Sequence, residues 1–310
     1  MNRSTAGTFC SASPWLNVIY CTAGSLIVFE NVLMIVVIIR TPGLHNIANI
    51  LVTSLSVTDA IVGFIAAMAG ILFAVLKPSD WIFRYIYISV AATILGTTLC
   101  SHLHIAAIAI DRYIYIAHPF FYFRHVNEKV VFRCLLGVWF LVSLYTLASA
   151  LSIKTRMFCL MREVMDLYIS YVGSWITLFL LCLTSAAYFR IAAISLRHRR
   201  SIASVNIAAL PSTNPSQPGN DRVSISEETW THMLKTVRFF VVMTGSFAAM
   251  MVPVTICNFL FGHVQLSKTL LNTVTMLPIL QSGFNFFINI FMNSDFRQAV
   301  VQVFLCRSVI

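Results

Sequence analysis

The sequence predicts an all-α protein, a bundle of seven transmembrane helices followed by a short amphipathic eighth helix. Of the 310 residues, 58% are hydrophobic and 10% are charged, whereas soluble domains carry about 25% charged residues. The mean hydropathy is +0.83, and seven long apolar runs make up most of the chain. Such a composition requires the bilayer as solvent, and the chain carries no catalytic motif that would indicate an enzyme.

The predicted spans are separated by proline, glycine or charged residues, which interrupt apolar runs. A helix that crosses the hydrocarbon layer needs about 20 apolar residues. The spans cover 16–39, 47–75, 84–116, 131–153, 168–194, 232–262 and 269–292. Residues 1–310 are therefore predicted to form a single seven-transmembrane domain, in which residues 1–15 are the N-terminal segment and residues 16–292 contain the seven spans.

The segment 197–230 differs in composition from the spans. It begins with a basic cluster and continues with three prolines and several Asn and Ser residues. Because such a segment buries little apolar surface, we expect a disordered third cytoplasmic loop.

The segment 294–306 is expected to form the eighth helix, with Asn293 or Ser294 as its N-cap. Its apolar side chains recur on one helical face, and it is too short to span, so we expect it along the inner membrane interface. Cys306 ends this segment, and both a palmitoylated and an unmodified thiol remain open.

The orientation follows from the basic residues, because cytoplasmic loops carry an excess of Lys and Arg. Fourteen of the 21 Lys and Arg residues lie on one side of the predicted spans. We therefore predict a multi-pass plasma-membrane protein with an extracellular N-terminus and a cytoplasmic C-terminus. The net charge of +10 is then explained by loops that face anionic lipid, and no motif indicates nucleic-acid binding.

The outer segments contain two candidate modification sites. Asn2 begins an Asn-Arg-Ser triplet, which predicts N-glycosylation. Cys10 and Cys159 both lie in predicted outer segments, and whether they form a disulfide stays open. The eight cysteines include no closely spaced pair, so no metal site is expected.

Asp59 lies midway along the second span, where an ionisable group costs about 2.5–3.5 kcal/mol. Polar residues at similar depth are Asn31, Ser101, Gln281, Ser282 and Asn285. Two interpretations remain open and are compatible: a small wet cavity that holds Na⁺ or water, or a hydrogen-bonded cluster that joins the helices. No other cofactor is expected.

Each span contains at least one marker of a known receptor family. The markers are Asn31, Leu55 to Asp59, Asp111-Arg112-Tyr113 with Pro119, Trp139, Tyr188, Phe247 with Pro253, Asn285 to Asn289, and Phe296-Arg297. In this order they resemble the rhodopsin-like (class A) G-protein-coupled receptors, over about residues 16–306. A narrower resemblance connects Glu30-Asn31, Tyr87 and a proline-free fifth span with the melanocortin, lysophospholipid, cannabinoid and adenosine receptors.

The resemblance implies that a ligand signal passes to a heterotrimeric G protein. Asp111 would hold Arg112 at rest, and the residues expected to take part in coupling and activation are Asp111, Arg112, Tyr113, Pro119, Phe120, Tyr188, Pro253 and Asn289. Met251, Phe286 and Asn289 depart from the family pattern. A degenerate or constitutively active receptor without its own ligand therefore remains an alternative, and a small-solute transporter ranks far lower.

The expected ligand pocket is largely apolar. Its candidate residues are Ile94, Thr98, Trp175, Phe179, Met251 and Asn258. Such a lining suits a lipid-like or small neutral ligand, and ordinary packing of a bundle interior is the alternative. The C-terminal Ser308-Val309-Ile310 resembles a ligand of PDZ domains.

Overall fold

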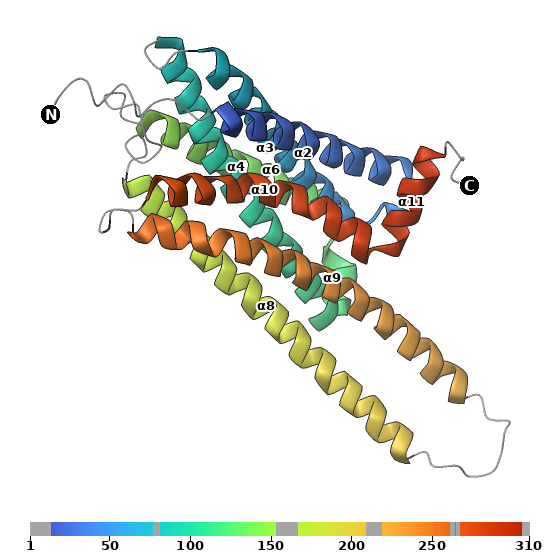
Figure 1. Cartoon of the computed structure of the whole chain (residues 1–310). Helices are drawn as coiled ribbons and strands as arrows, with labels where there is room; N and C mark the ends of the chain where they lie inside the picture. Colours follow the sequence, from blue (N-terminus) through green and yellow to red (C-terminus); the bar gives the residue numbers. More distant parts are fainter. Residues whose placement is uncertain are drawn as a thin grey trace.

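The computed structural model describes residues 14–76, 81–152, 167–208, 219–260, 264 and 267–305, in which every regular element is a helix (Figure 1). Seven of these helices are long and apolar enough to cross a bilayer, which confirms the predicted fold class. They are α2 (Pro14–Arg40), α3 (Ile47–Val75), α4 (Trp81–Ala117), α6 (Glu128–Ser152), α8 (Leu167–Ala208), α9 (Gly219–Leu260) and α10 (Lys268–Met292).

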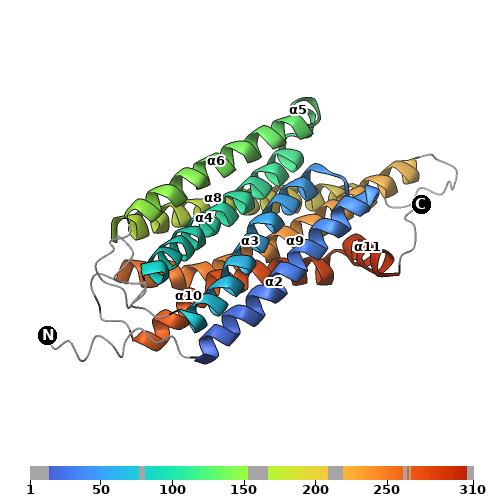
Figure 2. The ribbon, with the colours of Figure 1, turned by 90° about the horizontal axis from the view of Figure 1, so that it is seen from above.

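Three short elements lie at one end of the bundle: η1 (Pro42–Leu44), α5 (Pro119–His125) and α11 (Ser294–Phe304) (Figures 1 and 2). The helix α2 starts at the opposite end and runs toward α11. An odd number of crossings therefore separates the start of α2 from α11. We call the end with α5 and α11 the inner end.

Side-chain caps begin two of the helices at this end, α3 and α11. The Asn46 side chain accepts a hydrogen bond from the Asn49 amide at 3.0 Å and so starts α3. For α11, Asn293 is the N-cap, since its side chain accepts hydrogen bonds from the amides of Asp295 and Phe296, both at 3.1 Å. Phe296, Ala299 and Val300 are buried on one face, so α11 has the expected amphipathic character.

The expected loop over 197–230 requires a correction. The helix α8 continues to Ala208 and α9 begins at Gly219, while residues 209–218 lie outside the described residues. The prolines of this segment fall at positions 211, 215 and 218. Extending a helix that already exists requires no new nucleus, so α8 and α9 can continue beyond the membrane edge into this segment.

Small residues bring α2 and α3 close together. A Cβ atom added to Gly24 would lie 2.5 Å from the Gly63 carbonyl oxygen. Close backbone approach of this kind is typical of helix packing in membranes, where association depends on van der Waals contact. The outer faces remain apolar, and α6 exposes Leu136, Phe140 and Leu151, as expected for side chains that face lipid.

Candidate functional site

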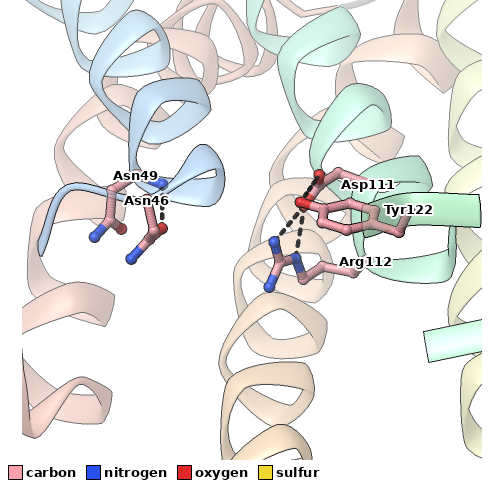
Figure 3. A network of polar contacts seen from close by, with 5 residues as sticks. All are labelled: Asn46, Asn49, Asp111, Arg112 and Tyr122. Atoms are coloured by element: carbon pink, nitrogen blue, oxygen red, sulfur yellow. Dashed lines mark hydrogen bonds and ion pairs between the residues drawn. The ribbon is translucent and has the colours of Figure 1, made fainter. Parts of the chain in front are cut away.

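The side chains of Asp111, Arg112 and Tyr122 form a polar network near the inner end of α4 (Figure 3). The Arg112 Nε donates to Asp111 Oδ2 at 2.8 Å, and Arg112 Nη2 forms an ion pair with the same oxygen. The Tyr122 hydroxyl donates to Asp111 Oδ1 at 2.9 Å. The guanidinium carbon of Arg112 also lies 5.2 Å from the centre of the Tyr115 ring, within reach of a cation–π contact. Each oxygen of the Asp111 carboxylate therefore accepts at least one hydrogen bond.

Tyr122 was not among the site residues predicted from the sequence. Pro119 begins α5 at its first turn, and the short helix directs Tyr122 back to α4, eleven positions after Asp111 along the chain. Burial raises the pKa of the Tyr122 phenol, and the negative charge of Asp111 raises it further. The phenol therefore stays protonated and acts as a donor to Asp111.

Under the coupling that the resemblance implies, we expect Tyr122→Phe to raise the ligand-independent signal about fivefold. The reason is that the substitution removes one hydrogen bond, worth about 1 kcal/mol, from the closed arrangement, in which Asp111 holds Arg112. Recruitment of a G protein by the unliganded receptor measures this. Tyr115→Phe is the matched control, because its ring, 5.1 Å from that of Tyr122, is retained. An unchanged signal in Tyr122→Phe would show that this bond does not hold the closed arrangement.

The other predicted coupling residues lie at the inner end or in the inner half of their spans, except Pro253, which lies seven residues before the outer end of α9. Tyr188 is buried, Pro253 is inside α9, and Phe120 is 92% exposed. Asn289 donates to the carbonyl oxygen of Asn285 at 2.8 Å. The same nitrogen also lies 3.9 Å from the Met34 sulfur, so the Asn289 side chain contacts α2 as well. Tyr113 is half-buried and its ring contacts His118 with centres 6.0 Å apart.

The structure brings the predicted polar cluster together around Asp59. The Asn285 Nδ2 donates to Asp59 Oδ2 at 2.7 Å, and the Ser101 hydroxyl donates to Asp59 Oδ1 at 3.5 Å. The Asn31 Nδ2 donates to the carbonyl oxygen of Ser282 at 3.1 Å. These bonds join α2, α3, α4 and α10, so the cluster does connect helices.

Gln281 faces a small cavity beside this cluster. The cavity measures about 10 Å³ and is also lined by Ser101, Ser282, Phe247 and Met251, which is about the space of one water molecule. Among the described residues, the Gln281 Oε1 and the Asn285 Oδ1 are buried without a hydrogen-bond partner. Oxygen ligands of this kind, next to a carboxylate, suit a small hard cation or a water molecule.

The predicted ligand pocket is only partly assembled. Met251 and Thr98 line the small cavity, and Ile94 is half-buried. Asn258 already has a protein partner, because its Nδ2 donates a hydrogen bond to the Ser174 hydroxyl at 3.1 Å.

Trp175 and Phe179 are 64% and 67% exposed, so they do not line the bundle interior, which corrects the expected pocket. Lipid and bundle interior are equally apolar. Hydrophobicity along the fifth span therefore did not reveal which face points inward.

Several predicted sites lie outside the described residues. They are Asn2, Cys10, Cys159, Cys306 and Ser308 to Ile310. Their modification, disulfide and partner predictions therefore remain predictions. Among the described residues, no group of three or more potential metal ligands occurs.

The chain matches a family profile described as "7 transmembrane receptor (rhodopsin family)" over residues 30–291. It is also similar to human "G-protein coupled receptor 12", with 22% identity over 95% of this chain and 80% of that protein. It is 30% identical to the Xenopus laevis "Melatonin receptor type 1C" over 38% of this chain and 27% of that protein. It is 31% identical to the rat "Trace amine-associated receptor 2" over 36% of this chain and 33% of that protein.

The last two matches span only about a third of the relatives' own length. The relatives carry melatonin and amine receptor names. The expected branch of melanocortin, lysophospholipid, cannabinoid and adenosine receptors is not confirmed by them. The family match, in contrast, extends over most of the chain.

Proposed function

The chain belongs to the rhodopsin family of seven-transmembrane, G-protein-coupled receptors, and we propose that it passes a ligand signal to a heterotrimeric G protein through Arg112. The observation that carries this proposal is the Asp111–Arg112–Tyr122 network. The guanidinium of Arg112 is bound by the neighbouring Asp111, and the Arg112 side chain is only 12% exposed. Opening of the inner end would release this charge toward the cytoplasm, and we place the α11 end there on the excess of basic residues.

The test is recruitment of each G-protein class to the unliganded and liganded receptor in cells. We expect at least one class to be recruited above the level of cells without the receptor. A flat response across all classes, with normal surface expression, would contradict the proposal.

For the ligand we propose a lipid-like or small neutral molecule. The residues that line the cavity include Val62, Phe247 and Met251 and carry no charge. Residues 81–100, which form the first part of α4, contain no Asp or Glu. A protonated amine, as the names of several relatives suggest, would lack a counter-charge there, and a buried unpaired charge is costly.

A panel of neutral lipids and protonated amines distinguishes the two ligand classes. We expect recruitment to respond to a neutral lipid and not to amines. A response to amines alone would reject the apolar ligand, while leaving coupling through Arg112 in place.

A constitutively active receptor without its own ligand is the second candidate. It is favoured by the size of the cavity, which at about 10 Å³ holds about one water molecule. It is also favoured by Met251, Phe286 and Asn289, which depart from the family pattern. Such a receptor would signal in the recruitment panel without any added lipid.

A further inference from the structure

The acidic side chain of Glu30 lies in the seam between α2 and α10, which pack against each other (Figures 1 and 2). Glu30 is 3% exposed. A Cβ atom added to Gly283 on α10 would lie 3.2 Å from the Glu30 Oε2, so this glycine makes room for the carboxyl group. The neighbouring Asn31 bonds instead to the Ser282 carbonyl oxygen. The hydrogen bonds described above around Asp59 therefore do not include Glu30.

The carboxyl group of Glu30 lacks a protein partner. Its Oε2 is buried and has no hydrogen-bond partner among the described residues. The elements that contact α2 are α3, η1, α10 and α11. Their titratable residues, with those of α2 itself, are Asp59 on α3, Lys268 on α10, Asp295 and Arg297 on α11, and Tyr20, Cys21 and Arg40 on α2.

The three cations on these helices lie too far along the helix axes to pair with Glu30. Arg40 is ten residues further along α2, about 15 Å at a rise of about 1.5 Å per residue. Lys268 is fifteen residues before Gly283, about 22 Å by the same rise. The Arg297 Nη1 donates to a backbone carbonyl oxygen of α10 at 3.2 Å, about 10 Å along the helix from Gly283. An ion pair requires a separation of about 4 Å or less.

The charge state of Glu30 follows from these surroundings. An ionised carboxylate in hydrocarbon is costly without a counter-charge or a donor, and such a group takes up a proton instead. We propose that Glu30 is an intramembrane proton-binding site, which holds its proton while the seam between α2 and α10 is closed. Loss of the proton creates a charge that only water can solvate, and water enters only when the two helices separate.

The seam borders the lipid phase. Phe29, the residue before Glu30, is 60% exposed, and Phe284, the residue after Gly283, is 43% exposed. Both belong to spans that hydrocarbon surrounds. A small apolar reagent dissolved in the bilayer can therefore reach the Glu30 carboxyl group from the side, without passing through the bundle interior.

The proton site is connected to the polar cluster through α10. Asn285 lies two residues after Gly283, and its Nδ2 donates to Asp59 Oδ2 at 2.7 Å. A seam that loosens when Glu30 ionises should weaken this bond and so favour the open arrangement. This consequence for signalling rests on the proposed function, whereas the proton site itself does not.

Dicyclohexylcarbodiimide tests for the proton in the full-length receptor, reconstituted in phosphatidylcholine vesicles. A protonated carboxyl group gives its proton to one nitrogen of the reagent, and its oxygen bonds to the central carbon. The acyl group then moves to nitrogen and leaves a stable acylurea, with no atom lost. We expect mass spectrometry to find this adduct on Glu30, with a yield that falls as the pH rises. A water-soluble carbodiimide should leave Glu30 unlabelled.

Two variants test the geometry of the seam. Gly283→Ala places a methyl group against the Glu30 Oε2 and should lower the labelling yield at least about threefold. Gly137→Ala is the matched control, because a Cβ atom added to Gly137 on α6 would meet nothing within 4 Å. Its labelling should equal that of the wild type.

Glu30→Gln keeps the shape of the side chain and removes the proton site. In the wild type the unfolded chain releases the proton that the closed seam retains, so stability falls as the pH rises. The apparent melting temperature of the purified wild type should therefore fall with rising pH more steeply than that of Glu30→Gln. Basal recruitment by the wild type in vesicles should rise with pH by at most about tenfold per pH unit, since one proton is released.

The outcomes separate this site from the proposed function. An adduct on Glu30 in a receptor that recruits no G protein would reject the proposed function and support the proton site. Absence of the adduct at every pH, or equal pH dependence of melting in the wild type and Glu30→Gln, would overturn the proton site. Measurable recruitment with the same pH dependence in both would overturn its connection to signalling.

Discussion

Arg112→Ala is expected to reduce G-protein recruitment to the level of cells without the receptor, with or without ligand. The guanidinium is the charged group that the inner network of α4 holds in place. An alanine removes the group proposed to face the G protein, and no neighbouring cation replaces it in the described network of Asp111, Arg112 and Tyr122. The measurement is recruitment across all G-protein classes, corrected for receptor at the cell surface.

The same substitution also leaves Asp111 with one partner fewer, so a loss of stability has to be separated from a loss of coupling. An unsatisfied buried acceptor costs about 1–3 kcal/mol, which thermal unfolding of the purified receptor would show. Arg133→Ala is the matched control, because Arg133 is exposed on α6 and its Nε donates to the Lys129 carbonyl oxygen at 3.2 Å. If Arg112→Ala recruits as well as the wild type, the proposed route through Arg112 is wrong.

Asp59→Asn is expected to abolish any sodium dependence of the ligand-independent signal. In the wild type, replacing choline chloride with sodium chloride at constant ionic strength should lower basal recruitment, since a cation among Asp59, Ser101 and Asn285 would hold the helices together. A neutral amide supplies no charge to attract the ion. The measurement is basal recruitment over a sodium titration.

Ser56→Ala is a suitable control, because Ser56 is buried on the same helix but its hydroxyl has other partners than Asp59, namely the Val52 carbonyl oxygen and the Met34 sulfur, both at 3.0 Å. Its sodium response should equal that of the wild type. If the wild type itself shows no sodium response, the cluster serves only to join helices. Asp59→Asn would then change thermal stability alone, because the Asn285 Nδ2 would keep a single amide oxygen as partner.

The cluster illustrates how far residue types predict contacts. A carboxylate in the middle of a span requires polar partners. Candidate partners could therefore be predicted from the polar residues that lie at the same depth in the other spans. The sequence therefore predicted which residues form the cluster, but it did not predict which of them bond directly to Asp59. Asn285 and Ser101 bond to Asp59, whereas the Gln281 side chain faces the cavity.

What the sequence by itself determined was the number of spans, their approximate limits and the amphipathic α11, since these depend on apolar run length and helical periodicity. What only the tertiary structure decided was which face of each span points inward. Trp175 and Phe179 face outward, Tyr122 turns back onto Asp111, and Glu30 faces Gly283 in the seam between α2 and α10. The physical reason is that lipid and bundle interior are equally apolar, so hydrophobicity does not distinguish them, and the packing of neighbouring helices sets the rotation of each one.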